Sequence, residues 1–296
     1  MNTFVKVVLL TVLVFILTSC NLLHKEKSNN GQADQQLDND TITILAIGID
    51  TRGEEQSRSD AILISQYDPQ TKSIKLASLM RDSYVKIPTY SKEYNKLNMA
   101  YYLGGKDLLV KTIQENFNIA IDHVVEIDFE GFTYVVDAIA PEGIEVDVPQ
   151  EMITDMDMKV QSGKNSLHGE DLLKYVRFRH DSSYDFGRVK RQQEVMLKLK
   201  DELANELSFK QLAGLPKLIE GAMQYVTSDL TVSQSLSLAS MVVLNPIEDI
   251  ETITIPLEGS YVNRRYEHAG EVLQLDFTKN IEALSGFFGI PKAVNN

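Results

Sequence analysis

"TITILAIGI", residues 41–49, decides the fold. The stretch is apolar and rich in β-branched side chains, and it is long enough to be a strand buried in the centre of a sheet. Gly48 and Asp50 mark its end, where we expect the chain to turn. A sheet with a buried central strand needs other elements to cover it, so the neighbouring segments decide its class.

Strands and helices alternate on the C-terminal side of this stretch. "AILISQYD" and "SIKLASLM" predict two more strands, joined by a turn at Pro69. Further helices and strands follow without a repeating period. We predict strands at 123–127, 143–149 and 251–256, and helices at 106–117, 129–140, 169–178, 186–207, 209–225, 231–244 and 276–288. We therefore predict one α/β domain, a mixed central sheet covered by helices on both faces, spanning residues 41–296.

The N-terminus is typical of an exported protein. The apolar run Val7–Leu17 is too short to span a bilayer but fits the core of a signal peptide. It leads into "LTSC", which resembles a bacterial lipobox. We predict a signal peptide at 1–19, lipidation of Cys20, and a flexible linker at 20–40. A plain signal peptide or a short membrane anchor is the alternative, and all of these put the bulk of the chain outside the cytoplasm. With the lipid anchor we expect the protein at the extracytoplasmic face of the cell membrane.

The composition restricts the partners. The chain has 42 acidic against 29 basic residues, a net charge of −13, so its surface repels polyanions and we expect no nucleic-acid partner. Apolar residues make up 43% of the chain, enough for a sizeable core. Cys20 is the only cysteine, which excludes an intramolecular disulfide.

Arginine is concentrated in three short segments, although lysine is spread over the chain. A guanidinium presents a rigid fork of donors that matches phosphate and carboxylate groups. The pattern favours a local anion site, with structural ion pairs as the alternative. The arginines of the three segments are Arg52, Arg58, Arg81, Arg177, Arg179, Arg188 and Arg191, and only Arg264 and Arg265 lie elsewhere.

Acidic residues accompany these arginines at predicted strand ends. "GIDTRGEEQSRSDA" (48–61) contains Asp50 and Asp60, which suit a hard divalent cation if the arginines hold an anion that also touches it. "MRDSYV" (80–85) puts Arg81 beside Asp82, and Lys96 follows in "NKLNMAYYLGG". Each group has a structural alternative: ion pairs in loops, Asp82 as a partner of Arg81 only, and a helix capped by Asn95 or Asn98.

The densest segment is "VRFRHDSSYDFGRVKRQQ", residues 176–193. Arg188 and Arg191 are three apart and share a face of the predicted helix. The N-terminus of that helix adds N–H donors for a phosphate, and Asp185 is a plausible N-cap.

Four segments, taken in order, resemble the LytR-CpsA-Psr family of cell-wall polymer ligases. They are "ILAIGIDTRG…RSDAILI", "ASLMRDSYVKIP", "NKLNMAYYLGG" and "LHGEDLLKYVRFRHDSSYDFGRVKRQQ". The motifs cover residues 44–193, and residues from about 225 form a C-terminal elaboration. The resemblance implies a phosphotransferase that moves a glycopolymer, such as wall teichoic acid or capsule, from undecaprenyl pyrophosphate to peptidoglycan. Met80 replaces the family's usual proline, and the lipobox replaces its usual transmembrane helix.

The resemblance also assigns roles by position. Asp50 and Asp60 match the aspartates that bind Mg²⁺, or Mn²⁺ in its place, and Lys96 and Gln192 fall in substrate-binding motifs. Asp82 either orients Arg81 or accepts a proton. The pyrophosphate-binding arginines correspond to Arg52, Arg58, Arg81, Arg177, Arg179 and Arg188.

Two other functions use the same residues. A polyprenyl-pyrophosphate hydrolase would pass the polymer to water, and a non-catalytic envelope lipoprotein would only bind an anionic glycan. The apolar stripes of the predicted helices either line a groove for the polyprenyl chain or are ordinary core, and core packing is the preferred interpretation.

Overall fold

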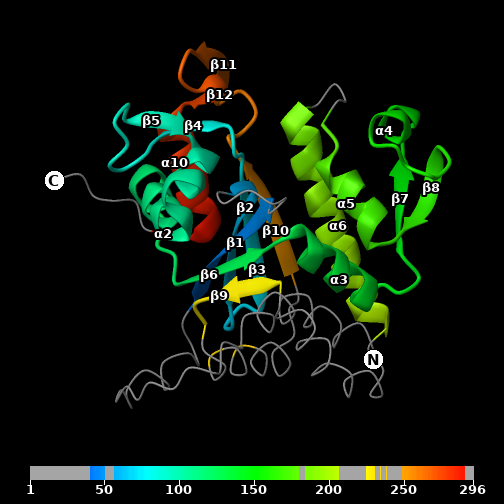
Figure 1. Ribbon diagram of the computed structural model, residues 1–296. Coiled ribbons are helices and arrows are strands. Elements are labelled where there is room, and N and C mark those ends of the chain that lie inside the picture. The colour runs from blue at the N-terminus through cyan, green and yellow to red at the C-terminus, as the bar shows by residue number, and fades with distance from the viewer. Residues whose placement is uncertain are drawn as a thin grey trace, which may run out of the picture. The chain divides into compact units, whose positions relative to one another are not determined.

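The computed structural model describes residues 41–50, 57–179, 184–206, 225–230, 234, 238 and 249–290. The chain divides into two compact units (Figure 1), which are described separately. The sheet unit comprises residues 41–67, 74–126 and the chain from 250 onward, and the helical unit comprises residues 68–73 and 127–249. Both units combine strands with helices, so the predicted α/β class is confirmed. No helix within the described ranges is long and apolar enough to cross a membrane.

The main sheet is built around the predicted central strand. Ile44, Leu45 and Ile47 of β1 are fully buried, as their β-branched and apolar side chains require. β1 pairs antiparallel with β2, and a register shift after Gly48 introduces a bulge near the end of this hairpin. The strands of the sheet unit run in the order β10-β3-β2-β1-β6, with bounds Asp249–Ile255, Ser73–Leu79, Arg58–Asp68, Ile42–Asp50 and His123–Ile127.

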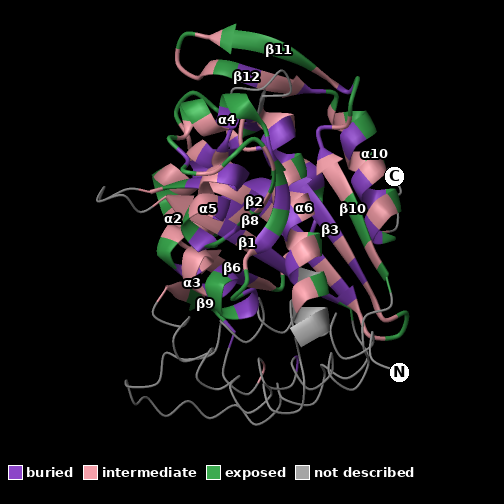
Figure 2. Cartoon of the chain, turned by 90° about the vertical axis from the view of Figure 1, so that its right-hand side faces the viewer, coloured by how far each residue is buried: buried purple, intermediate pink, exposed green. Residues whose placement is uncertain are grey.

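A second, four-stranded sheet was not predicted from the sequence. Its β12 is parallel to β4, whereas the pairs β11–β12 and β4–β5 are antiparallel. The sequence signal was weak because β4 and β5 have only four and three residues, and because most of β11 is exposed (Figure 2). The order is β11-β12-β4-β5, with bounds Tyr261–Tyr266, Gly270–Leu275, Ser83–Lys86 and Tyr94–Lys96.

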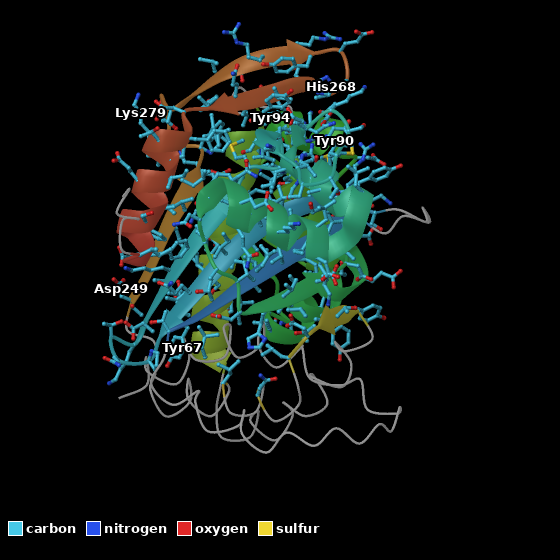
Figure 3. The ribbon with its side chains drawn as sticks, turned by 90° about the vertical axis from the view of Figure 1, so that its left-hand side faces the viewer. Tyr67, Tyr90, Tyr94, Asp249, His268 and Lys279 are labelled. Atoms are coloured by element: carbon cyan, nitrogen blue, oxygen red, sulfur yellow. The ribbon has the colours of Figure 1, made fainter. Side chains whose placement is uncertain are left out.

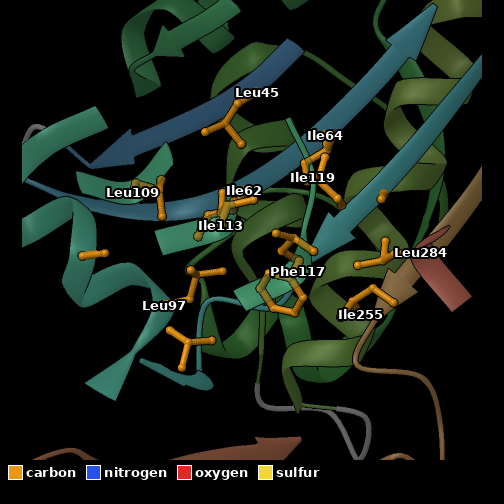
Figure 4. Packing of buried hydrophobic residues seen from close by; sticks show 14 of the residues in the cluster. Leu45, Ile62, Ile64, Leu97, Leu109, Ile113, Phe117, Ile119, Ile255 and Leu284 are labelled. Atoms are coloured by element: carbon orange, nitrogen blue, oxygen red, sulfur yellow. The ribbon is translucent and has the colours of Figure 1, made fainter. Parts of the chain in front are cut away.

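Two helices complete the sheet unit, α2 (Leu97–Phe117) and α10 (Phe277–Phe288). α2 starts nine residues before the predicted 106, because its backbone leaves helical geometry at Gly104 and Gly105 and the periodicity breaks there. Lys96 precedes the helix without a side-chain cap, so the proposed capping by Asn95 or Asn98 is wrong. Leu109, Ile113 and Phe117 of α2 pack with Leu45, Ile62 and Ile255 in one core (Figure 4).

The helical unit has its own core. Val136, Leu172 and Val195 come from three different helices and are buried together. The apolar stripe of α3 and the described part of the α6 stripe thus pack in this core, and the α2 stripe packs in the core of the sheet unit, as preferred from the sequence. The elements are α3 (Phe129–Ile139), α4 (Gln150–Asp155), α5 (Gly169–Arg177), α6 (Tyr184–Glu206), the hairpin β7 (Ile144–Val148) and β8 (Gly163–Leu167), and β9 (Val226–Ser228). The predicted helices at 209–225 and 231–244 fall almost wholly outside the described residues.

The N-cap of α10 gives a prediction about stability. The Asp276 carboxylate accepts a hydrogen bond from Lys279 N–H at 3.2 Å, and this bond lowers the pKa of Asp276. Because its pKa is lower in the folded state, Asp276 stabilises the fold at pH values above its unfolded-state pKa of about 3.9. This contribution is lost as the pH falls through the folded-state pKa. We expect Asp276→Ala to lower the Tm by about 2 °C at pH 7 and by less at pH 3. Thermal unfolding at both pH values checks this, with Asp276→Asn as the control that keeps the cap. Equal Tm values for the wild type and Asp276→Ala at pH 7 would contradict the prediction.

Candidate active site

Four of the predicted site residues form a chain of ion pairs in the sheet unit. The Arg81 guanidinium donates through Nη1 to Oδ1 of Asp60, and its Nε lies 3.7 Å from Oδ2 of Asp82. Lys96 Nζ lies 2.7 Å from the other carboxylate oxygen of Asp82. The four side chains are between 14% and 25% exposed, so they are shielded from bulk water yet open to a ligand. Asp60 from the start of β2 thus meets the adjacent pair Arg81 and Asp82 from the end of β3, and Lys96 joins them.

The turn that carries Arg81 and Asp82 is fixed by its backbone. Asn98 N–H, in α2, donates to Arg81 O at 3.1 Å, and Leu273 N–H, in β12, donates to Asp82 O at 2.9 Å. Met80 N–H donates to Ile255 O at 2.8 Å. A proline at position 80 has no N–H to donate, so methionine adds a backbone bond here. A turn held by three elements keeps both side chains in one geometry.

Asp50 lies near this chain of ion pairs in the strand register. It is the cross-strand partner of Arg58, and Asp60 is the nearby β2 residue that the bulged register skips. The Arg58 guanidinium carbon lies 5.4 Å from the centre of the Tyr102 ring, a cation–π contact that no sequence motif indicated. Arg52 lies outside the described residues.

Asp50 and Asp60 fit the predicted Mg²⁺ site in one particular way. Within the ranges that the structure describes, no group of three or more Asp, Glu, His or Cys side chains forms a metal cage. Mg²⁺ is commonly held by only one or two carboxylates, with substrate phosphates and water completing its six oxygen ligands. Two carboxylates on adjacent strands fit that pattern, in which the phosphate-bearing ligand is part of the metal site.

The helical unit holds a second group of predicted residues, around Asp185. Arg188 is only 3% exposed, and its Nη1 lies 3.3 Å from Asp185 Oδ1. Arg179 Nη1 lies 3.9 Å from the same oxygen. Because α6 begins at Tyr184, Asp185 is inside the first turn, so its predicted role as N-cap is wrong. It instead holds two guanidiniums beside the N-terminal turns of the helix.

The remaining residues of this segment brace it. Arg191 donates through Nη2 to the backbone oxygen of Phe178 and lies over the Phe178 ring, 5.2 Å from its centre. Gln192 Nε2 donates to Val176 O at 3.5 Å. The Arg177 guanidinium carbon lies 4.2 Å from the centre of the Phe129 ring, which fixes it against α3. These contacts tie the end of α5 to α6 and to α3.

Sequence reasoning missed Tyr175 in this unit. Its hydroxyl donates to Glu194 Oε2 at 2.9 Å, so it links α5 to α6. Burial, followed by the bond to Glu194, raises the pKa of Tyr175, and the hydroxyl therefore keeps its proton and donates. No motif marked it, because a tyrosine in an amphipathic helix is also typical of a core.

These features define an α/β protein whose carboxylates and guanidiniums, at strand and helix ends, suit a phosphate-bearing ligand. The chain belongs to the LytR_cpsA_psr family, which matches residues 15–283, and the predicted resemblance is thereby confirmed.

Named relatives and solved structures agree with this membership. The regulatory protein MsrR of Staphylococcus aureus strain COL is 37% identical over 246 residues, 83% of this chain and 74% of that protein. The polyisoprenyl-teichoic acid–peptidoglycan teichoic acid transferase TagU of Bacillus cereus is 29% identical over 267 residues, 88% and 84% of the two chains. The structure of TagT bound to LIIa-WTA is similar with a TM-score of 0.68 and 25% identity, covering 92% of this chain and 99% of that one. B. subtilis TagV is similar with a TM-score of 0.67 and 28% identity, covering 85% and 98%.

Proposed function

We propose that the protein transfers a glycopolymer, such as wall teichoic acid or capsule, from undecaprenyl pyrophosphate to peptidoglycan. One observation carries the proposal: the anchored chain of ion pairs Asp60–Arg81–Asp82–Lys96, which brings four of the predicted residues together. The names of two similar proteins support it. TagU is a teichoic acid–peptidoglycan transferase, and TagT was solved with LIIa-WTA bound.

The chemistry needs local positive charge more than it needs a reactive side chain. A pyrophosphate diester carries two negative charges, and these must be neutralised before a sugar hydroxyl can approach. In the proposed reaction a peptidoglycan hydroxyl attacks the phosphorus nearest the glycopolymer, and its proton passes to water. The bond from that phosphorus to the bridging oxygen breaks, polyprenyl phosphate leaves, and the polymer is joined to peptidoglycan by a phosphodiester.

The ion pairs suggest a role for each residue of the sheet unit. Arg81, whose guanidinium is oriented by Asp60 and Asp82, binds phosphate oxygens with its remaining donors. Asp82 contacts both Arg81 and Lys96, which favours an orienting role over that of proton acceptor. Asp50 and Asp60 would hold Mg²⁺, or Mn²⁺, which neutralises phosphate charge when bound. The other proposed phosphate-binding residues are Arg52, Arg58, Arg177, Arg179 and Arg188.

The anchoring predicted from the sequence remains a proposal, since residues 1–40 lie outside the described ranges. We propose that a lipid on Cys20 holds the domain at the extracytoplasmic face of the membrane, where the polyprenyl donor is embedded. Replacing Cys20 by serine, followed by membrane fractionation, tests the anchor independently of the chemistry.

Reconstitution with lipid-linked glycopolymer and isolated peptidoglycan tests the reaction. We expect a covalent polymer–peptidoglycan conjugate whose formation stops on chelation with EDTA and resumes when Mg²⁺ is added. Asp50→Asn and Asp60→Asn should each raise the Mg²⁺ concentration for half-maximal rate by about tenfold or more, because each removes a charged oxygen ligand. Glu145→Gln, an exposed acid of the helical unit, is the control.

Each alternative has its own signature in that assay. Release of free polymer without conjugate would instead establish a hydrolase. Tight donor binding that persists without Asp50 and Asp60, with no turnover at any Mg²⁺ concentration, would establish a glycan-binding lipoprotein.

A further inference from the structure

The four-stranded sheet carries an aromatic stack that the proposed phosphate chemistry does not use. The Tyr84 ring stacks on Tyr266 with centroids 4.6 Å apart and on Tyr94 with centroids 5.6 Å apart. His268 Nε2 lies 3.0 Å from the Tyr94 carbonyl oxygen and 3.3 Å from the Tyr84 hydroxyl. Figure 3 shows Tyr94 close to His268, which lies in the turn of the β11–β12 hairpin. We call Tyr84, Tyr94, Tyr266 and His268 the tyrosine platform.

The pleat of the strands puts this platform on the face away from the core. Successive residues of a strand point to opposite faces of its sheet. Val85 and Leu275 belong to the buried core of the sheet unit, so Tyr84 and Gln274, which precede them, point the other way. The register pairs Gln274 with Tyr84, which confirms that both share one face. Tyr94 is 38% exposed, so the stack is open to a ligand.

Positive charge lies on the same face. Arg264 is exposed and two residues from Tyr266, so it shares the platform side of β11, whereas Arg265 points to the opposite side. Lys86 is opposite Tyr94 and Lys96 is opposite Tyr84 in the strand register. In a chain of net charge −13, three cations around one aromatic stack favour a ligand that carries negative groups.

The platform is continuous with the candidate active site. Lys96, opposite Tyr84, is the residue that contacts Asp82 at 2.7 Å. A ligand on the aromatic stack therefore lies beside one end of the chain of ion pairs. This proximity favours a reactant of the transfer over an unrelated partner.

We propose that the tyrosine platform binds the acceptor glycan, a peptidoglycan strand, which extends the proposed function and rests on it. The C–H face of a pyranose ring is apolar and packs on an aromatic face, and the tyrosine hydroxyls offer hydrogen bonds to its polar rim. Peptidoglycan also carries carboxylates, which Arg264 and Lys86 can pair. A polyprenyl tail has no groups for these cations, so the lipid of the donor fits the platform poorly.

The protonation of Tyr84 suits this role. Burial, followed by the neighbouring phenols of Tyr266 and Tyr94, raises the pKa of Tyr84. The phenol therefore stays neutral over the physiological range and remains a hydrogen-bond donor for a sugar oxygen.

Co-sedimentation of the detergent-solubilised full chain with peptidoglycan sacculi, stripped of teichoic acid and without donor lipid, tests the proposal. We expect Tyr94→Ala and Tyr266→Ala each to weaken binding roughly fivefold or more, and Tyr94→Phe to retain most of it. Arg264→Ala should weaken binding, whereas Arg265→Ala, its neighbour on the other face, should not. Unchanged Tm values exclude a folding defect.

Three results would overturn the inference. The first is that Tyr94→Ala and Tyr266→Ala both bind sacculi as tightly as the wild type. The second is that Arg264→Ala and Arg265→Ala weaken sacculus binding equally. The third is that the platform variants lose binding to purified teichoic acid but keep binding to sacculi. Failure of the proposed function looks different, because wild-type protein would then bind sacculi through the platform but form no conjugate. If only the inference fails, conjugate forms and the KM for peptidoglycan is unchanged in Tyr94→Ala.

Discussion

We expect Arg81→Ala to lower kcat/KM for the proposed conjugate formation by about 10²- to 10³-fold, the usual loss when one fixed donor to a developing charge is removed. The guanidinium is the central member of the ion-pair chain, so the change also leaves Asp60 and Asp82 without the cation between them. Those two carboxylates then add negative charge where the proposed pyrophosphate donor would bind. We therefore expect a higher KM for the donor as well as a lower kcat.

Arg81→Lys separates charge from geometry. Lysine restores a positive charge, but a single ammonium cannot reach both carboxylates and a phosphate as the planar fork does. We expect it to recover only a small part of the lost rate. Lys164→Ala, which removes an exposed cation paired with Glu145 at 3.0 Å, is the control and should leave transfer unchanged. If Arg81→Ala transferred polymer at the wild-type rate, Arg81 would not be part of the site.

The buried strands were predictable because their composition is determined by burial. The stretch 41–49 and strand 123–127 were placed within a residue of their observed bounds, since buried β-branched runs have few alternatives. β11 was not predicted, because four of its six residues are exposed and its pairing with β12 supplies the missing stability. The first nine residues of α2 were not predicted, because Gly104 and Gly105 interrupt the helical pattern. Their low helix propensity indicates a break, whereas tertiary packing keeps the residues on both sides helical.

The candidate site was predictable in composition but not in pairing. That Asp60 and Arg81 lie at one edge of the sheet could be predicted, because each stands at the end of a neighbouring predicted strand. The sequence could not show that Arg179 and Arg188 share Asp185. A shift of one residue in where α6 begins decides whether Asp185 is the N-cap or a side-chain partner inside the first turn. The tyrosine platform was not predicted either, since its residues come from three short strands and a turn.

Arg188 offers the sharpest test between a binding role and a structural one. It is 3% exposed and paired with Asp185, so its ion pair alone could explain its burial. Arg188→Met removes one partner of a buried pair, which typically costs about 3 kcal/mol of unfolding free energy or more. With the proposed binding role we also expect roughly a 10²-fold lower kcat/KM, because a guanidinium that contacts the donor phosphate is then lost.

A second variant separates these two effects. Adding Asp185→Asn to Arg188→Met removes both charges of the pair, and replacing a whole buried ion pair by neutral groups is often close to neutral for stability. Arg179, which also faces Asp185 at 3.9 Å, keeps its charge in both variants. If Arg188 binds the donor, the double variant regains its unfolding free energy in denaturant titrations but not its transfer rate. If the arginine only stabilises the fold, stability and rate return together, and Arg188 then leaves the list of substrate-binding residues.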